Sequence, residues 1–252
     1  MLRTNFIIVL AFTAYCMQSA KAQLALDFEK CRFGDAACST NVANIILKKY
    51  AKTGLRALNL IPFDPLHIKS LTFDQNPNSP INIRLNFKEI DILGLTNANN
   101  VKVEGLTRDV KGPILLEGTL PQAIIRGPYQ GSGTILGLPF KGKGNCEIVL
   151  KNIKLTSKLN GKLVKKADDE YLSIVDVSLT MSKPDNVHFQ FGGLFDGNKD
   201  LADTANSFVN ENWPEIYAEL RPAMEKAFAL IVQGIANNVF SKNPYPKLFL
   251  AE

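Results

Sequence analysis

The residues of this 252-residue chain that could carry catalysis are few and poorly spaced. Of its two histidines, His67 lies just beyond a proline-bounded turn and His188 lies in a strand-like run. Neither has a recognisable nucleophile partner in the sequence, which leaves open only partners brought close by the fold. Residues 131–133 (Gly-Ser-Gly) do not match a nucleophile elbow. We therefore expect no enzyme, with a hydrolase as the alternative only if a histidine meets a serine or aspartate in space.

One glycine-rich segment approaches a nucleotide-binding loop but lacks its magnesium ligand. Residues 137–144 read G-x-x-x-x-G-K-G, and Gly144 stands where a P-loop has serine or threonine. Two histidines do not suffice for a multi-histidine metal site. The acidic residues 168–170 favour a polar hairpin loop, with weak calcium binding as the alternative. We expect no nucleotide, metal or other cofactor.

The first 22 residues have the layout of a secretory signal peptide. Arg3 precedes an apolar run over residues 6–17, and Ala-Lys-Ala at 20–22 gives a small-x-small cleavage site. The run is too short for a typical transmembrane helix, so an uncleaved anchor is the weaker alternative. We expect a signal peptide over 1–22, a single mature domain over 23–252, an extracellular location and no stable membrane insertion.

The charge balance gives no sign of a polyanionic partner. The chain has 29 lysines and arginines against 24 aspartates and glutamates, a formal charge of +5. Loss of Arg3 and Lys21 with the signal peptide would lower the charge to +3. No arginine-rich patch with interleaved aromatics is present. We expect no nucleic-acid partner and a monomer.

The cysteines separate into three kinds. Cys16 lies in the segment that would be removed, whereas Cys31 and Cys38 lie seven apart in a chain bound for an oxidising compartment. We expect these two to form a disulfide. Cys146 is left over, and its alternating neighbours place it in the core as a small apolar group. A reactive thiol or an intermolecular bridge at Cys146 is the alternative.

An amphipathic helix is predicted near the start of the mature chain. Residues 39–58 carry apolar side chains close to helical spacing. Ser39 or Thr40 can cap the first turn, and Pro62 and Pro65 would stop the helix.

From His67 to about residue 191 apolar residues recur at every second position, which predicts strands. The apolar parity flips between 87 and 90, and again between 150 and 153, which predicts a β-bulge at each place. The turn signals between the strands lie at residues 97–100, 126–128, 142–145 and 160–161. Asn160-Gly161 is the strongest hairpin signal. Strands without helices between them predict an antiparallel meander, and repeated bulges predict strong curvature.

The last fifty residues return to helical spacing. Apolar side chains over 201–239 predict a long amphipathic helix. Asn212 begins a pattern that resembles a capping box with Pro214 in the first turn, so one helix should end near residue 210 and a second begin. Pro222 predicts a kink. The fold class is therefore α+β, with a long C-terminal helix wrapped by a highly curved antiparallel β-sheet.

An apolar interior without chemistry is typical of a lipid site. The chain has 15 phenylalanines, many on inward parities, which by themselves indicate only a core. A curved sheet around a helix often leaves an elongated gap, and an apolar tunnel with few polar groups binds lipids. A 15-carbon isoprenoid would gain on the order of 10 kcal/mol gross, at about 0.8 kcal/mol for each buried CH₂.

Several motifs in order resemble one family. They are the Cys31–Cys38 pair and residues 61–66 (IPFDPL), 126–129 (RGPY), 138–140 (LPF), 194–199 and 210–213. Together they are similar to the insect takeout and haemolymph juvenile-hormone-binding family over essentially the whole mature chain. The resemblance implies the tubular lipid-binding fold and a secreted, non-enzymatic carrier of a small hydrophobic ligand, either a juvenile-hormone-like terpenoid or a fatty-acid-like lipid.

The resemblance also implies site residues. In the hormone-binding branch a tyrosine that corresponds to Tyr129 donates a hydrogen bond to the ligand. The other residues expected to line the tunnel are Phe140, Phe189, Phe191, Phe208, Trp213 and Phe228. That branch has a second disulfide, but no cysteine follows Cys146, which favours the takeout branch. The alternative function is a secreted signalling protein that acts through a receptor or protein partner, with a lipid only as a structural element.

Overall fold

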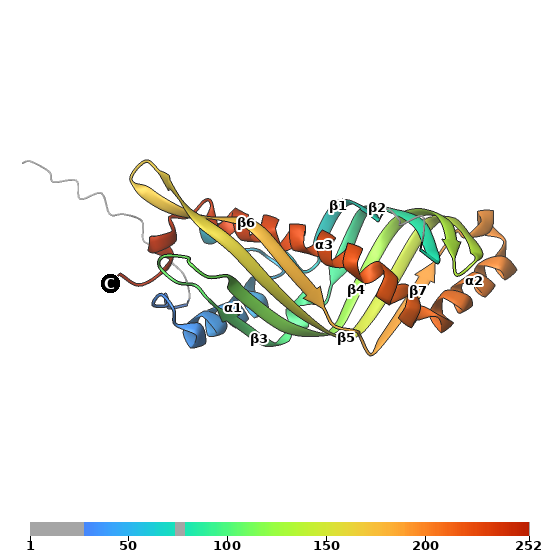
Figure 1. Ribbon diagram of the computed structural model, residues 1–252, viewed down its shortest axis with the longest axis horizontal. Coiled ribbons are helices and arrows are strands. Elements are labelled where there is room, and N and C mark those ends of the chain that lie inside the picture. Colours follow the sequence, from blue (N-terminus) through green and yellow to red (C-terminus); the bar gives the residue numbers. More distant parts are fainter. Residues whose placement is uncertain (1–27, 74–78, 252) are drawn as a thin grey trace, which may run out of the picture.

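The computed structural model describes residues 28–73 and 79–251. In this part of the chain a sheet curves along one long helix, and the molecule is elongated (Figure 1). The expected signal peptide over 1–22 lies outside the described residues. No helix of the described part is long and apolar enough to cross a membrane.

The described sheet has seven antiparallel strands built on two long ones. The strands are β1 (Leu66–Phe73), β2 (Ile81–Leu93), β3 (Asn99–Glu104), β4 (Ile114–Ile135), β5 (Leu138–Lys166), β6 (Asp169–Met181) and β7 (Asn186–Phe191). Both long strands change partner midway: β4 pairs with β3 and then β2, and β5 pairs with β7 and then β6. The sheet therefore has two ends, which we call the α1 end, with β3 and β6, and the α2 end, with β1, β2 and β7.

The helices occupy both ends and the length between them. They are α1 (Ala36–Tyr50), α2 (Lys199–Glu211) and α3 (Trp213–Phe240), with short 3₁₀ turns η1 (Arg56–Leu58), η2 (Leu95–Asn97), η3 (Phe195–Gly197) and η4 (Tyr245–Leu248). Figure 1 shows α1 and α2 at opposite ends and α3 running between them along the sheet. The predicted fold class is confirmed.

The first predicted bulge is confirmed and the second is wrong. Between Phe87 and Asp91 the register of β2 against β4 shifts, and Glu89 adopts a positive φ of 51°. At Asn152, φ is also 51°, but the register of β5 against β4 does not shift. The apolar parity of β5 inverts near Asn152 because its pairing changes there: β5 pairs with β7 before this residue and with β6 after it.

Three of the predicted turns are wrong. Residues 126–128 lie inside β4, and residues 142–145 and 160–161 lie inside β5. Their glycines serve close packing instead: a Cβ on Gly142 would lie 2.7 Å from a methyl carbon of Leu194. The signal at 160–161 marks a register shift between β5 and β6. Glycine inside a strand often indicates such a bulge or close approach, which a local pattern does not separate from a turn.

Helix α1 begins earlier and ends earlier than predicted. Asp35 caps it, accepting a hydrogen bond from the Cys38 N–H at 2.8 Å, so the predicted Ser39 or Thr40 cap is wrong. The helix ends at Tyr50 because Gly54, with φ of +70°, turns the chain back and donates its N–H to the Tyr50 carbonyl at 2.7 Å. The prolines further along are not needed to stop it.

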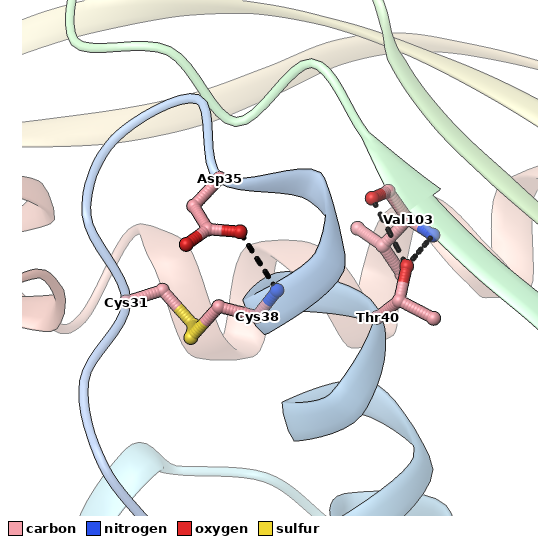
Figure 2. The surroundings of a disulfide bond; sticks show 5 residues. All are labelled: Cys31, Asp35, Cys38, Thr40 and Val103. Carbon is pink, nitrogen blue, oxygen red and sulfur yellow. Dashed lines mark hydrogen bonds between the residues drawn. A yellow bond between two sulfur atoms is a disulfide. The ribbon is translucent and has the colours of Figure 1, made fainter.

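A disulfide ties the N-terminal segment to α1, and a threonine of α1 ties the helix to the sheet. Cys31 and Cys38 form the expected disulfide, with their Cα atoms 5.6 Å apart (Figure 2). Thr40 Oγ1 accepts a hydrogen bond from the Val103 N–H at 2.9 Å and lies 3.4 Å from the Val103 carbonyl. A threonine of α1 thus satisfies one backbone residue at the outer edge of β3, and α1 docks there.

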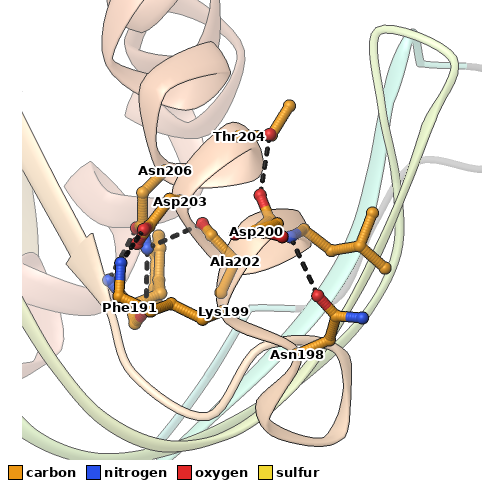
Figure 3. Close-up of polar contacts among 9 residues, drawn as sticks. Phe191, Asn198, Lys199, Asp200, Ala202, Asp203, Thr204 and Asn206 are labelled. Atoms are coloured by element: carbon orange, nitrogen blue, oxygen red, sulfur yellow. Dashed lines mark hydrogen bonds and ion pairs between the residues drawn. The ribbon is translucent and has the colours of Figure 1, made fainter.

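Helix α2 holds the edge of β7 with two asparagines. Asn206 accepts from the Phe191 N–H at 2.9 Å and donates to the Phe191 carbonyl at 3.0 Å (Figure 3). Asn210, one turn later, makes the same pair of bonds to Phe189, each at 2.8 Å. A carboxamide has both a donor and an acceptor, so each asparagine replaces one residue of a missing neighbouring strand.

The predicted break between two C-terminal helices is confirmed, but the capping box is not. Pro214 lies in the first turn of α3, as expected. Asn212 makes no side-chain cap and instead donates to the Phe208 carbonyl at 2.8 Å. Helix α3 continues through Pro222. Further along α3, Asn237 makes the same type of paired bonds to Ile174 of β6, at 2.9 Å each.

Candidate ligand-binding cavity

A cavity of about 470 Å³ lies at the α1 end, between the sheet, α1 and α3. Helix α1 contributes Ala43, Ile46 and Leu47, and α3 contributes Phe228, Ile231, Val232, Ile235, Ala236, Val239 and Phe240. The strands contribute mainly leucine, isoleucine and valine. Only two of the described lining residues have polar side chains, Glu117 and Ser157. The cavity therefore offers an apolar surface with almost no chemistry.

The two polar residues differ in exposure. Glu117 lies at the rim, because its side chain is 34% exposed and pairs with Lys154 at 3.3 Å. Ser157 is only 3% exposed and faces the interior. No described group of three or more histidine, cysteine, aspartate or glutamate residues could hold a metal ion.

The wall beside η2 is built around a buried carboxylate. Phe63 and Leu66 line the cavity, and Asp64 between them is 5% exposed. Asp64 accepts hydrogen bonds from the N–H groups of Gly94 at 3.0 Å and Thr96 at 2.7 Å, and from the Thr96 hydroxyl. The motif at residues 61–66 thus fixes one wall of the cavity, and its polar group turns away to satisfy backbone donors.

A second cavity, of about 40 Å³, lies at the α2 end and is lined by aromatic and aliphatic side chains. Phe140 packs edge-on against Phe191 with ring centroids 5.3 Å apart, and Phe189 stacks on Phe191 at 6.1 Å. A volume of this size holds a few water molecules at most. Ile125 and Leu150 line both cavities and so stand between them.

The residues predicted to bind the ligand are divided between these regions. Phe228 lines the larger cavity, and Phe140, Phe189 and Phe191 line the smaller one. Tyr129, Phe208 and Trp213 are in neither lining. Their roles in binding remain predictions.

Two of these aromatic residues have other contacts. The Tyr129 hydroxyl donates a hydrogen bond to the Gly192 carbonyl at 3.0 Å, and burial raises the pKa of this hydroxyl. The Tyr129 ring lies 5.0 Å from that of Phe191, which places it with the aromatic group of the α2 end. The ammonium group of Lys183 lies over the Trp213 ring, 5.6 Å from the ring centroid, in a cation–π contact.

Sequence reasoning missed the aliphatic residues that form most of the larger lining. Alternating positions of β5 (Ile153, Leu155, Ser157 and Leu159) all line it. This period of two was visible in the sequence, but it indicates only which face is buried. Whether that face meets a side chain or empty space depends on the distance to helices far away in the chain.

The remaining reactive groups lie away from the cavity. Cys146 is 4% exposed, as predicted for a core residue, and burial raises the pKa of its thiol to about 11. His67 lies on the surface, with its ring nitrogens 2.6 Å from a Glu89 oxygen and 3.0 Å from an Asp91 oxygen. His188 is exposed on β7.

Known proteins match this chain along most of its length. The family model described as "Haemolymph juvenile hormone binding protein (JHBP)" matches residues 6–250. The circadian clock-controlled protein daywake of Drosophila melanogaster is 25% identical over 242 residues, which cover 94% of this chain and 92% of daywake. The daywake protein of Drosophila yakuba is 24% identical over 229 residues, 89% of this chain and 87% of that protein.

A solved structure matches as well. The crystal structure of Epiphyas postvittana Takeout 1 superposes with a TM-score of 0.73 at 27% identity, covering 88% of this chain and 100% of Takeout 1.

Proposed function

The chain belongs to the haemolymph juvenile hormone binding protein family, and from this premise we propose that it is a secreted carrier of a terpenoid or fatty-acid-like lipid. The family consists of carriers of hydrophobic ligands, and the chain is a binding protein and not an enzyme. The ligand would lie in the cavity at the α1 end, and the mature carrier would run over residues 23–252 as one domain.

The observation that carries this proposal is the nearly all-apolar, mainly aliphatic cavity of about 470 Å³. Small-molecule sites in proteins commonly measure about 300–1,000 Å³. Transfer of a 15-carbon chain from water into such a lining stabilises the complex by on the order of 10 kcal/mol gross. Loss of ligand freedom reduces this gain, yet the remainder can hold a lipid without a charged contact.

A binding titration tests the proposal. Delipidated protein should bind the fluorescent probe N-phenyl-1-naphthylamine saturably, at one site and with a Kd of roughly micromolar or below. A 15-carbon terpenoid methyl ester or palmitic acid should displace the probe. Correctly folded protein, shown by circular dichroism, that gives no saturable binding would contradict carriage.

The secretion part of the proposal has a separate test. Expression of the full chain in insect cells should deliver protein to the medium, and intact mass should place its first residue at Gln23. Retention of the full-length chain in the cell membranes would contradict cleavage after Ala22.

A further inference from the structure

One buried hydroxyl interrupts the apolar column that β5 presents to the cavity. Ile153, Leu155, Ser157 and Leu159 occupy alternate positions of β5, and all four line the cavity. In a strand such positions share one face, so the Ser157 side chain lies on the face of its leucine neighbours.

The neighbours across the sheet are apolar as well. Ser157 is in register with Leu116 of β4 on one side and with Leu179 of β6 on the other, and both leucines line the cavity. Leucine, isoleucine or valine would suit this position by packing alone. A serine here therefore needs another explanation.

The Ser157 hydroxyl has no hydrogen-bond partner among residues 28–73 and 79–251, although the residue is only 3% exposed. Buried polar groups in proteins are nearly always hydrogen-bonded, because the bonds lost to water are otherwise not replaced. Ser182, by contrast, accepts from the Lys154 N–H at 2.9 Å. The Ser157 hydroxyl is thus a free donor and acceptor inside an apolar cavity.

The chemistry of the cavity limits what this hydroxyl would bind. Glu117, the other polar lining residue, pairs with Lys154 and lies at the rim. No cationic side chain is among the described lining residues, so an ionised carboxylate in the interior would have no counter-charge. A neutral oxygen that accepts a hydrogen bond, such as that of a ketone, ester, epoxide or ether, has no such cost.

We propose that Ser157 is a polar anchor, which donates a hydrogen bond to a neutral acceptor oxygen of the ligand and so selects oxygenated lipids over hydrocarbons of the same length. This inference rests on the proposed function, because it requires a ligand in the cavity at the α1 end. The hydroxyl fixes where the oxygen lies along the cavity, and the aliphatic lining supplies most of the affinity.

Displacement of N-phenyl-1-naphthylamine by two matched competitors tests the proposal. Pentadecan-2-one and pentadec-1-ene have the same number of carbons, but the ketone has an acceptor oxygen near one end where the alkene has only a C=C bond. Substitution Ser157→Ala should weaken the ketone about tenfold, which corresponds to about 1.4 kcal/mol, and leave the alkene within twofold. Ser157→Thr retains a hydroxyl and should restore at least part of the preference for the ketone.

The matched control is Ser178→Ala. Ser178 lies on β6 beside Leu179 and is exposed, so its loss should change neither competitor. Unchanged ketone affinity in Ser157→Ala, or an equal loss for ketone and alkene, would overturn the anchor. Probe binding by the parent protein tests carriage independently, so failure of the anchor and failure of the proposed function give different results.

Discussion

The two ends of the sheet share β4 and β5 yet differ in how much space their side chains leave unfilled. At the α2 end, aromatic rings contact one another and leave about 40 Å³. At the α1 end, aliphatic side chains face about 470 Å³ of empty space. The attachments of the two short helices also differ: two asparagines of α2 hold β7, whereas Thr40 of α1 holds one residue of β3, and the paired asparagine bonds of the α1 end come from Asn237 of α3. The comparison indicates that side chains fill the space at the α2 end and leave room for a ligand at the α1 end.

Truncation of core side chains gives the largest expected effect. Phe87 is 2% exposed and its ring lies 5.8 Å from that of Phe73, so Phe87→Ala should lower the free energy of unfolding by about 3–5 kcal/mol. Leu155 lines the cavity, so part of its side chain faces space instead of packed neighbours, and Leu155→Ala should cost about 2 kcal/mol or less. Urea unfolding of the ligand-free proteins measures both. Equal losses would break the distinction between the two ends.

The helix attachments give the next largest effect. Asn206→Ala leaves the N–H and carbonyl of Phe191 without their side-chain partner and should cost about 2 kcal/mol. Thr40→Val at the other end removes one good bond, to the Val103 N–H, and should cost about 1 kcal/mol. Hydrogen exchange of the Phe191 and Val103 amides, with urea unfolding, measures these losses. A larger loss for Thr40→Val would reverse the proposed difference in attachment.

Some features of the fold could be predicted because their cause is local. The parity flip between Phe87 and Ile90 fixes which side chains face inward, and the bulge follows from it. The break before Pro214 follows from the proline itself. These signals lie within a few residues of the structure they produce.

Other features depend on distant contacts and could not be read from the sequence. Gly142 is small because Leu194 and the Tyr129 hydroxyl approach it, yet in the sequence it resembled a turn. The aromatic residues predicted to bind the ligand mostly fill the α2 end, because large rings occupy space instead of leaving it. The cavity depends on how far α1 and α3 stand from β5, which no local pattern encodes.

The surface charges of β1 and β2 give the smallest expected effect. The hydrogen bond to Asp91, followed by the smaller effect of the one to Glu89, raises the pKa of His67 above its ordinary value of 6.5. The stability from this contact is therefore fully present below pH 6.5 and is lost as pH rises through the folded-state pKa. The Tm difference between the parent and His67→Gln should be larger at pH 5.5 than at pH 8.5. A difference that grows toward pH 8.5 would contradict this assignment.

The central claim, that ligand occupies the α1 end, is tested most directly by filling that cavity. Ala236 of α3 lines it, whereas Ala218 of the same helix is exposed. With folding verified by circular dichroism, Ala236→Phe should weaken binding of N-phenyl-1-naphthylamine at least tenfold, and Ala218→Phe should leave the Kd unchanged. Parent-like affinity in folded Ala236→Phe would contradict the account, because the probe would then bind elsewhere.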